Sequence, residues 1–212
     1  MNDRRPPPAP KRSPGKIIAA VVAVIAVLIV LNVGFGVLMV MMADEQPATA
    51  AERELLIDVS MVKDALEFFE PDPTKASAKR LKYFDGSLEL DYTYDDPRGS
   101  APFLTHVISY ERKSSDALAT YGTQWGSAKL MLAASGEDID IVEPADGYHW
   151  GEQSSFGIIT AGGDPVGNVF VARKGKMVVY IIFSGVFFDD AETFASTIEP
   201  YLEKAAVYGR TL

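Results

Sequence analysis

The sequence predicts an α+β protein in which a single N-terminal transmembrane helix is followed by one antiparallel sheet flanked by helices. Three observations lead to this prediction. Residues 17–43 contain no charged side chain. Later segments rich in Val, Ile, Phe and Tyr are separated by turns containing Gly and Asp, as is typical of antiparallel strands. Other segments place apolar residues three or four positions apart, which is the spacing of one helix face.

The apolar run is long enough to cross a bilayer. As a helix its 27 residues would rise roughly 40 Å, whereas the hydrocarbon core is about 30 Å thick. A cleaved signal peptide has a shorter apolar region, of about 7–15 residues. We therefore predict that residues 16–43 form an uncleaved transmembrane helix. Cleavage at the small-residue triplet Ala48-Thr49-Ala50 is the alternative.

The charges on either side of the run predict its orientation. Residues 1–16 hold five basic residues and one acidic residue, whereas Asp44 and Glu45 follow the run. Basic flanks stay on the cytoplasmic side. We expect residues 1–15 to be a disordered cytoplasmic tail and the later residues to lie outside the cell, beyond its inner (plasma) membrane. The bilayer itself is thus one expected partner.

Two residues inside the run suggest a protein partner in the membrane. A side-chain amide such as that of Asn32 finds no hydrogen-bond partner in hydrocarbon and is best accommodated against another helix. Gly36 follows four residues later and would allow a close approach. We predict contact there with a membrane protein or a second copy of the chain. An isolated Asn tolerated by a long span is the alternative.

Residues 44–75 are predicted to form a juxtamembrane helix and a linker. Thr49 and Glu52 have the spacing of a capping box. Apolar residues then recur at intervals of four and three up to Phe69, and Pro71 follows. A helix from residue 50 to residue 69 is therefore expected.

Residues 76–212 are predicted to form the extracytoplasmic domain, which opens with a hairpin. Asp85-Gly86 is a strong signal for a two-residue turn. Such a turn pairs Tyr83 with Leu88 and Leu81 with Leu90 on one face of the hairpin. Residues 88–94 then alternate apolar with mostly polar side chains, so the apolar set should face the core.

Two helices are expected among the later strands. The first starts near Ser114, and its Gly122 and Gly126 suggest close packing of the helix on the sheet. The second is capped by Asp189-Asp190 and is interrupted by Pro200. The predicted inward stripes are Leu118, Tyr121, Trp125, Ala128 and Leu132 for the first helix, and Phe194, Ile198 and Leu202 for the second.

The order of elements resembles the PsbP/Mog1-like family of extracytoplasmic α+β domains. The similar parts are "KYFDGSLELDYTYDDP", "FLTHVISYERKSSDALATYGTQW" and the ending from "GYHWGEQ" through "VFVARKGKMVVYIIFSGVFFDDAETFASTIEPYLEKA", which together lie within residues 78–206. The resemblance implies a non-catalytic accessory or assembly role beside a membrane complex. The apolar run and the helix after it depart from the family pattern.

Composition excludes several classes of function. The chain has no cysteine, which excludes disulfides, thiolate zinc sites and iron–sulfur clusters. Its net charge is −9; the first 16 residues carry +4, so the remainder carries −13. Such an acidic domain argues against nucleic acid and anionic lipid as its ligands. No cofactor or metal site is predicted.

Catalytic motifs are absent or incomplete. Ser60 and Lys63 match the S-x-x-K spacing of acyl-transferring enzymes, but the companion S-D-N and K-T-G motifs are missing. His106 lies on a predicted strand without a second metal ligand at the right spacing. We therefore predict no catalytic residues and a protein that is not an enzyme.

One aromatic cluster is a candidate for partner binding. Tyr148, His149 and Trp150 lie between two glycines. Aromatic side chains in such a loop can anchor a partner; the alternative is that Tyr148 and Trp150 begin a strand and fill the core. The predicted function is a membrane-anchored accessory or scaffold protein that binds a membrane protein complex. A ligand-binding or sensing domain is the alternative, and an unrecognised hydrolase or acyl transferase comes third.

Overall fold

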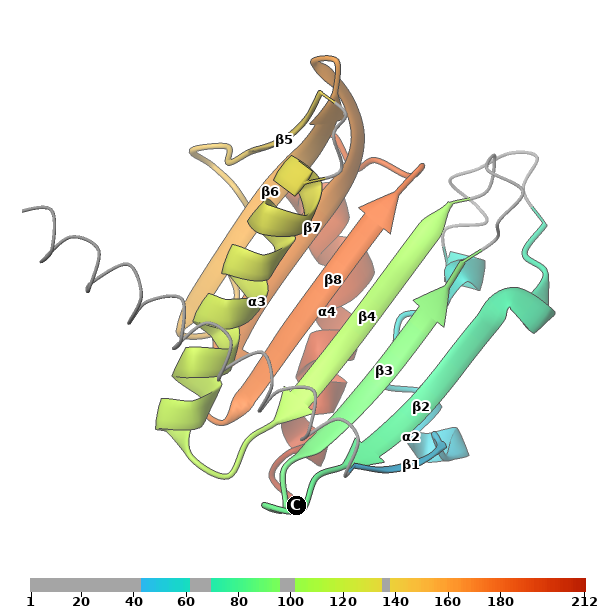
Figure 1. The fold of residues 1–212 in the computed structure, drawn as a ribbon, viewed down its shortest axis with the longest axis vertical. Coiled ribbons are helices and arrows are strands. Elements are labelled where there is room, and N and C mark those ends of the chain that lie inside the picture. The colour runs from blue at the N-terminus through green and yellow to red at the C-terminus, as the bar shows by residue number, and fades with distance from the viewer. Residues whose placement is uncertain (1–42, 62–69, 96–101, 135–137) are drawn as a thin grey trace, which may run out of the picture. The chain divides into compact units, whose positions relative to one another are not determined.

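The computed structural model describes residues 43–61, 70–95, 102–131 and 138–212, together with the backbone of residues 132–134. Residues 43–212 form one compact unit. Its strands are β1 Asp44–Pro47, β2 Ala76–Lys82, β3 Leu88–Tyr94, β4 Phe103–Tyr110, β5 Ile139–Val142, β6 Gln153–Ala161, β7 Asp164–Lys174 and β8 Met177–Ser184. They form one antiparallel sheet in the order β1-β2-β3-β4-β8-β7-β6-β5 (Figure 1).

Two long helices cover the sheet, one on each face (Figure 1). Helix α3, Ser114–Ala134, contacts β5, β7 and β8. Helix α4, Ala191–Tyr208, lies on the opposite face and buries its apolar side there. The described chain also contains the short helix α2 at Ala50–Arg53, the 3-10 helix η2 at Pro73–Lys75 and a 3-10 turn at residues 59–61. The larger core lies between the sheet and α4.

The predicted fold class was wrong. The described chain is mostly one eight-stranded antiparallel sheet with three α-helices. None of the helices within the described residues combines the length and the apolar character that crossing a bilayer requires. The transmembrane prediction rested on residues 16–43, nearly all of which lie outside the described residues. The structure therefore gives no basis for that helix.

The first hairpin forms with a register one residue away from the prediction. Lys82 pairs with Leu88, and Tyr83 donates its N–H to the carbonyl oxygen of Ser87 at 3.0 Å. The loop thus has three residues instead of two. Gly86 has φ = 87° and donates its N–H to Tyr83 O at 3.0 Å, so it supplies the left-handed residue of a three-residue loop. The dipeptide Asp85-Gly86 is compatible with a two-residue loop and with a three-residue loop, and therefore it could not predict which of the two forms.

This register places a basic residue on the core side of the sheet. Arg80 pairs with Leu90, which is completely buried, while Lys79 takes the position opposite Asp91. Had the loop contained two residues, Arg80 would face away from the core. Its Nε lies 3.1 Å from the carboxylate of Glu52, at an angle that does not form a hydrogen bond.

The predicted helix after Thr49 ends after one turn. The capping box is present, because Thr49 accepts from the N–H of Glu52 and the Glu52 side chain accepts from the N–H of Thr49. However, α2 ends at Arg53, and residues 54–61 contain only turns, irregular backbone and a 3-10 turn at 59–61. The rest of the predicted stripe, residues 62–69, lies outside the described residues. A capping box fixes where a helix starts and says nothing of its length.

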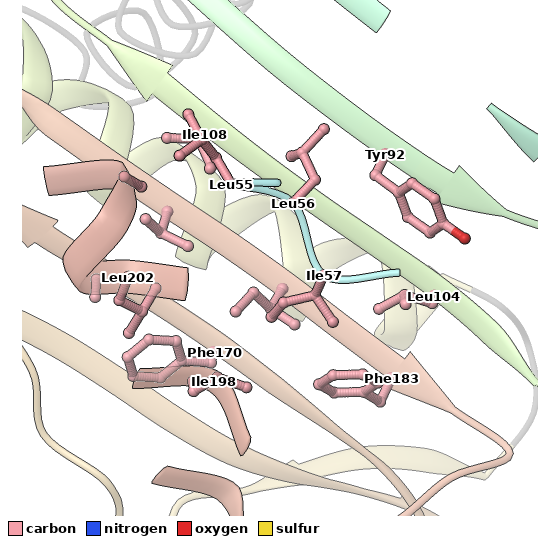
Figure 2. Close-up of a cluster of buried hydrophobic side chains, with 14 of the residues drawn as sticks. Leu55, Leu56, Ile57, Tyr92, Leu104, Ile108, Phe170, Phe183, Ile198 and Leu202 are labelled. Atoms are coloured by element: carbon pink, nitrogen blue, oxygen red, sulfur yellow. The ribbon is translucent and has the colours of Figure 1, made fainter. Parts of the chain in front are cut away.

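Residues 55–59 instead enter the core. Figure 2 shows Leu55, Leu56 and Ile57 among side chains of the sheet and of α4, with Ile108 and Ile198 nearby. All three are buried. Burying an aliphatic side chain of this size stabilises a fold by about 1.5–3 kcal/mol. Residues 55–57, which were predicted to lie in a juxtamembrane helix, are therefore an integral part of the core.

Helix α3 forms as predicted, and three residues of its predicted stripe face the sheet: Tyr121, Trp125 and Ala128. Ala117 and Ala128 are fully buried, and Trp125 packs against the sheet between them. Leu118, predicted to face inward, is half exposed. The expected close packing at Gly122 and Gly126 was wrong as well, because a Cβ added at either position would meet nothing within 4 Å.

Helix α4 agrees with the predicted stripe. Asp190 caps it by accepting from the N–H of Thr193, and its three predicted inward residues are fully buried: Phe194, Ile198 and Leu202. Phe194 lies at the centre of an aromatic group, with ring centroids 4.8 Å from Phe156 and 5.6 Å from Phe170. Pro200 is accommodated within the continuous helix.

Replacing Gly86 by Ala tests the hairpin loop. A left-handed conformation is unfavourable by roughly 1–2 kcal/mol for a residue with a Cβ, so we expect the free energy of unfolding to fall by about that amount. Chemical denaturation measures the change. Gly122→Ala is the matched control, because Gly122 lies in a helix with open space around it and the substitution should stabilise by up to about 1 kcal/mol. Equal stability of Gly86→Ala and the unaltered protein would contradict the loop described.

Candidate functional site

A buried histidine holds residues 55–59 against the sheet. His106 lies on β4 and is completely buried. Its Nδ1 accepts the backbone N–H of Ile57 at 2.8 Å. Val59, two residues further along the chain, is held in a similar way, because its N–H donates to the Tyr92 hydroxyl at 3.0 Å. Side chains of the neighbouring strands β3 and β4 thus accept hydrogen bonds from two backbone N–H groups that are not paired in the sheet.

The bond to Ile57 defines the chemistry of this histidine. A ring nitrogen that accepts a hydrogen bond carries no proton, so the proton of neutral His106 is on Nε2. Burial lowers the pKa of His106 to about 3. Nε2 has no hydrogen-bond partner among the described residues. Protonation of Nδ1 would replace the acceptor of the Ile57 N–H by a donor, and therefore the neutral ring is required for this contact.

A second buried group ties α2 to β2 and α4. Glu52 is almost completely buried and accepts hydrogen bonds from the Thr49 N–H (2.9 Å), the Thr49 hydroxyl (2.8 Å) and the Tyr208 hydroxyl (3.0 Å). Burial by itself raises the pKa of Glu52, but these bonds and the charge of Arg80 outweigh it, so the pKa lies below its ordinary value. The carboxylate is therefore a structural connection between three elements.

The predicted aromatic cluster is divided between core and surface. Tyr148 is 9% exposed, and its ring centroid lies 5.2 Å from that of Phe170. Trp150 is 7% exposed. His149 alone is exposed, and its Nδ1 lies 3.1 Å from the Ser154 hydroxyl. The interpretation that Tyr148 and Trp150 fill the core agrees with the structure, although they lie in a loop and the strand starts only at Gln153.

Trp150 joins this loop to α4. Its Nε1 donates to Glu203 at 2.8 Å, and Lys174 Nζ lies 2.9 Å from the same carboxylate and 4.7 Å from the centre of the indole ring. These contacts give Trp150 a structural role within the loop between Gly147 and Gly151. They leave its polar edge occupied, so Trp150 is no free anchor for a partner.

The remaining predicted residues do not form a site in the described chain. Asn32 and Gly36 lie outside the described residues, as does Lys63. Ser60 is exposed in a 3-10 turn, and its N–H donates to Asp58 at 2.7 Å. Among the described residues no three His, Cys, Asp or Glu side chains are placed to hold a metal ion.

Two half-buried carboxyl groups on β3 escaped the sequence analysis. Glu89 accepts from the Ser109 hydroxyl at 3.3 Å and from the Tyr83 hydroxyl at 3.4 Å. Burial and the neighbouring charge of Asp91 raise the pKa of Glu89, and burial raises that of Asp91. The alternation of the strand places both on the face opposite the main core. They are linked to hydroxyl groups, and no third metal ligand of the described chain joins them.

The outer surface of α3 is the most distinctive exposed feature. Leu118, Gly122, Gly126 and Leu130 lie four residues apart and form one row along the helix, which we call the α3 row. Leu118 is 49% exposed, Leu130 is 72% exposed, and the glycines between them meet nothing within 4 Å. Met131, 62% exposed, lies beside the row. Among the described residues nothing fills the space beside its glycines.

Comparisons with known protein families, with curated proteins and with solved structures find no match for this chain. The resemblance to the PsbP/Mog1-like family therefore stays a prediction, and the function has to be argued from the surfaces described above.

The titration of His106 predicts a loss of stability in mild acid. An unfolded histidine has a pKa of about 6.5, and the folded value of about 3 is lower. Below pH 6.5 the unfolded state binds the extra proton, so stability should fall by about 1.4 kcal/mol per pH unit down to about pH 3. Urea unfolding between pH 7 and pH 4.5 measures this slope.

The exposed His149 provides the control. His149→Asn should keep the slope, whereas His106→Leu should remove the histidine part of it and lower stability at pH 7, because the N–H of Ile57 loses its acceptor. If His106→Leu proves too unstable, NMR of the unaltered protein gives the same information. Protonation of His106 near pH 6.5 in the folded chain would contradict the structure.

Proposed function

We propose that this protein is a non-enzymatic accessory protein that binds a protein complex, which the sequence predicts to be a membrane complex, and that the α3 row is its contact surface. The observation that carries the proposal is the exposure of Leu118 and Leu130 on either side of two glycines that the fold does not need. Large apolar side chains gathered on one face are typical of interaction surfaces.

The geometry of the row favours a helix as the element bound. Residues at intervals of four form the ridges and grooves through which helices pack on one another. A groove between two leucines, with glycine at its base, accommodates the side chains of a second helix and lets the two backbones approach closely. The partner is therefore expected to present an apolar helix.

The glycines also indicate selection for something other than stability. Each glycine in a helix interior lowers stability by about 1 kcal/mol relative to Ala. Neither position packs on the sheet, so nothing within the described fold compensates for this loss. Surfaces that bind partners commonly retain residues that are unfavourable for the isolated fold. A contact made by α3 with another protein accounts for both glycines.

Replacing Leu130 by Glu is the test of this proposal. A charge within an apolar contact should reduce recovery of the partner in mild detergent by about tenfold, without changing the free energy of unfolding by more than about 0.5 kcal/mol. Quantitative mass spectrometry of the co-purified proteins measures the recovery. A photo-crosslinking residue at position 130 should capture the same protein.

Val207→Glu is the matched control, because Val207 is a similarly exposed apolar residue (58%) on α4. It should leave the recovery unchanged. Gly126→Ala should stabilise the fold and still weaken the association. Equal recovery with Leu130→Glu, Val207→Glu and the unaltered protein would refute the α3 row as the contact.

A further inference from the structure

One end of the sheet gathers four connections of the chain. They are residues 82–87 after β2, residues 111–113 after β4, residues 175–176 between β7 and β8, and residues 209–210 after α4. The antiparallel order brings them to the same edge, since β2, β4 and β7 all end there. Figure 1 shows them at the lower end of the sheet, where the C-terminus is marked. We call this surface the hairpin end.

Unpaired positive charge marks the hairpin end. Its basic side chains are all exposed: Lys82, Arg112, Lys113, Lys176 and Arg210. None of them forms an ion pair with a described residue. The acidic residues at this end are engaged locally. Asp85 accepts from the N–H and hydroxyl of Ser87, and Glu111 accepts from the hydroxyl of Thr120. Asp44 accepts from the side-chain amide of Gln46, and Glu152 forms an ion pair with Arg173.

An aromatic side chain projects from the same surface. Phe84 is the first residue of the three-residue hairpin loop and is 64% exposed, the largest aromatic exposure in the described chain. The loop is held by hydrogen bonds of its own, and Arg112 Nη1 donates to Asp85 O at 2.9 Å. An exposed phenylalanine on a firmly held loop, surrounded by lysine and arginine, is the composition of surfaces that enter lipid headgroups.

The chain also enters the fold at this end. Asp44, the first residue of β1, pairs with Lys82, the last residue of β2. The 27 uncharged residues 17–43 end immediately before Asp44.

The opposite end carries the reverse charge. Exposed aspartates follow β3, precede β5, begin β7 and precede α4: Asp95, Asp138, Asp164, Asp189 and Asp190. The strongly negative net charge is therefore unevenly distributed. An anionic surface would repel the aspartate end and attract the hairpin end, which orients the domain. A domain of negative net charge can therefore approach an anionic surface through its hairpin end.

We propose that the hairpin end is a docking surface for anionic lipid headgroups, with Phe84 inserted among them and the five basic side chains above the phosphates. This binding is separate from the contact proposed for α3. The α3 row runs along the side of the domain, so both surfaces can be occupied together.

Single-cysteine labelling of the full-length chain tests the proposal, because the chain has no cysteine of its own. A fluorescent label at Phe84→Cys should be quenched by a bilayer-resident quencher in vesicles of phosphatidylcholine with phosphatidylglycerol. The same label at Asp164→Cys, at the aspartate end, should stay unquenched. Lys113→Gln and Lys176→Gln should each lower the quenching at position 84, with a loss of affinity of about fivefold per charge removed.

Several results would overturn the proposal. One is equal quenching at positions 84 and 164. Another is quenching at 84 that is the same in pure phosphatidylcholine and in anionic vesicles, or that survives both lysine substitutions. Protection of the label in native membranes but not in protein-free vesicles would identify a protein as the occupant. Leu130→Glu should leave the quenching unchanged, so failure here and failure of the α3 contact are separable.

Discussion

The hydrogen bond from the Ile57 N–H to Nδ1 of His106 is the contact on which the N-terminal part of this fold depends. Residues 55–58 form no helix or strand and Val59 opens a 3-10 turn, yet four of these five side chains are buried: Leu55, Leu56, Ile57 and Val59. An unpaired backbone N–H in such a place is unfavourable by about 1–3 kcal/mol. His106 and Tyr92 supply the missing acceptors from two neighbouring strands. This allows an irregular segment, which comes directly after β1 and α2 in the chain, to act as part of the core.

The Glu52 cluster is a second buried polar contact of the N-terminal part, and the hairpin register determines one of its members. The three-residue loop places Arg80 on the core side, near Glu52, which also binds Thr49 and Tyr208. Strand β2, helix α2 and the end of α4 thus meet at one carboxylate. With its internal groups arranged in this way, the domain keeps two unusual surfaces free, the α3 row and the hairpin end.

The sequence predicted best those elements whose local signals agree with their packing. Helix α4 has a cap at Asp190 and a regular stripe through Phe194 and Leu202, and both are seen. It predicted poorly where one signal fits two structures. Thr49 and Glu52 form their capping box, but the apolar residues that follow fill the core from an irregular segment. Spacing alone cannot distinguish these outcomes, since both bury the same residues.

The surfaces were the least predictable part. Nothing local in the sequence shows that Gly122 and Gly126 face open space, because their orientation depends on which side of α3 meets the sheet. Ala117 and Ala128, small residues with little apolar weight, define that side in place of Leu118. The hairpin end depends in turn on strand order, which brings residues more than a hundred positions apart to one edge. The net charge of the chain gives no information on how the basic and acidic side chains are distributed over the surface.

Hydrogen exchange of the Ile57 amide, measured by NMR at neutral pH, tests the central contact most directly. If His106 holds residues 55–59 in the core, the amides of Ile57 and Val59 exchange several orders of magnitude more slowly than the exposed backbone nearby. Replacement of His106 by Leu then raises the rate at Ile57 far more than at amides within β8. An Ile57 amide that exchanges as fast as an unstructured peptide would show that this segment is not held in the core.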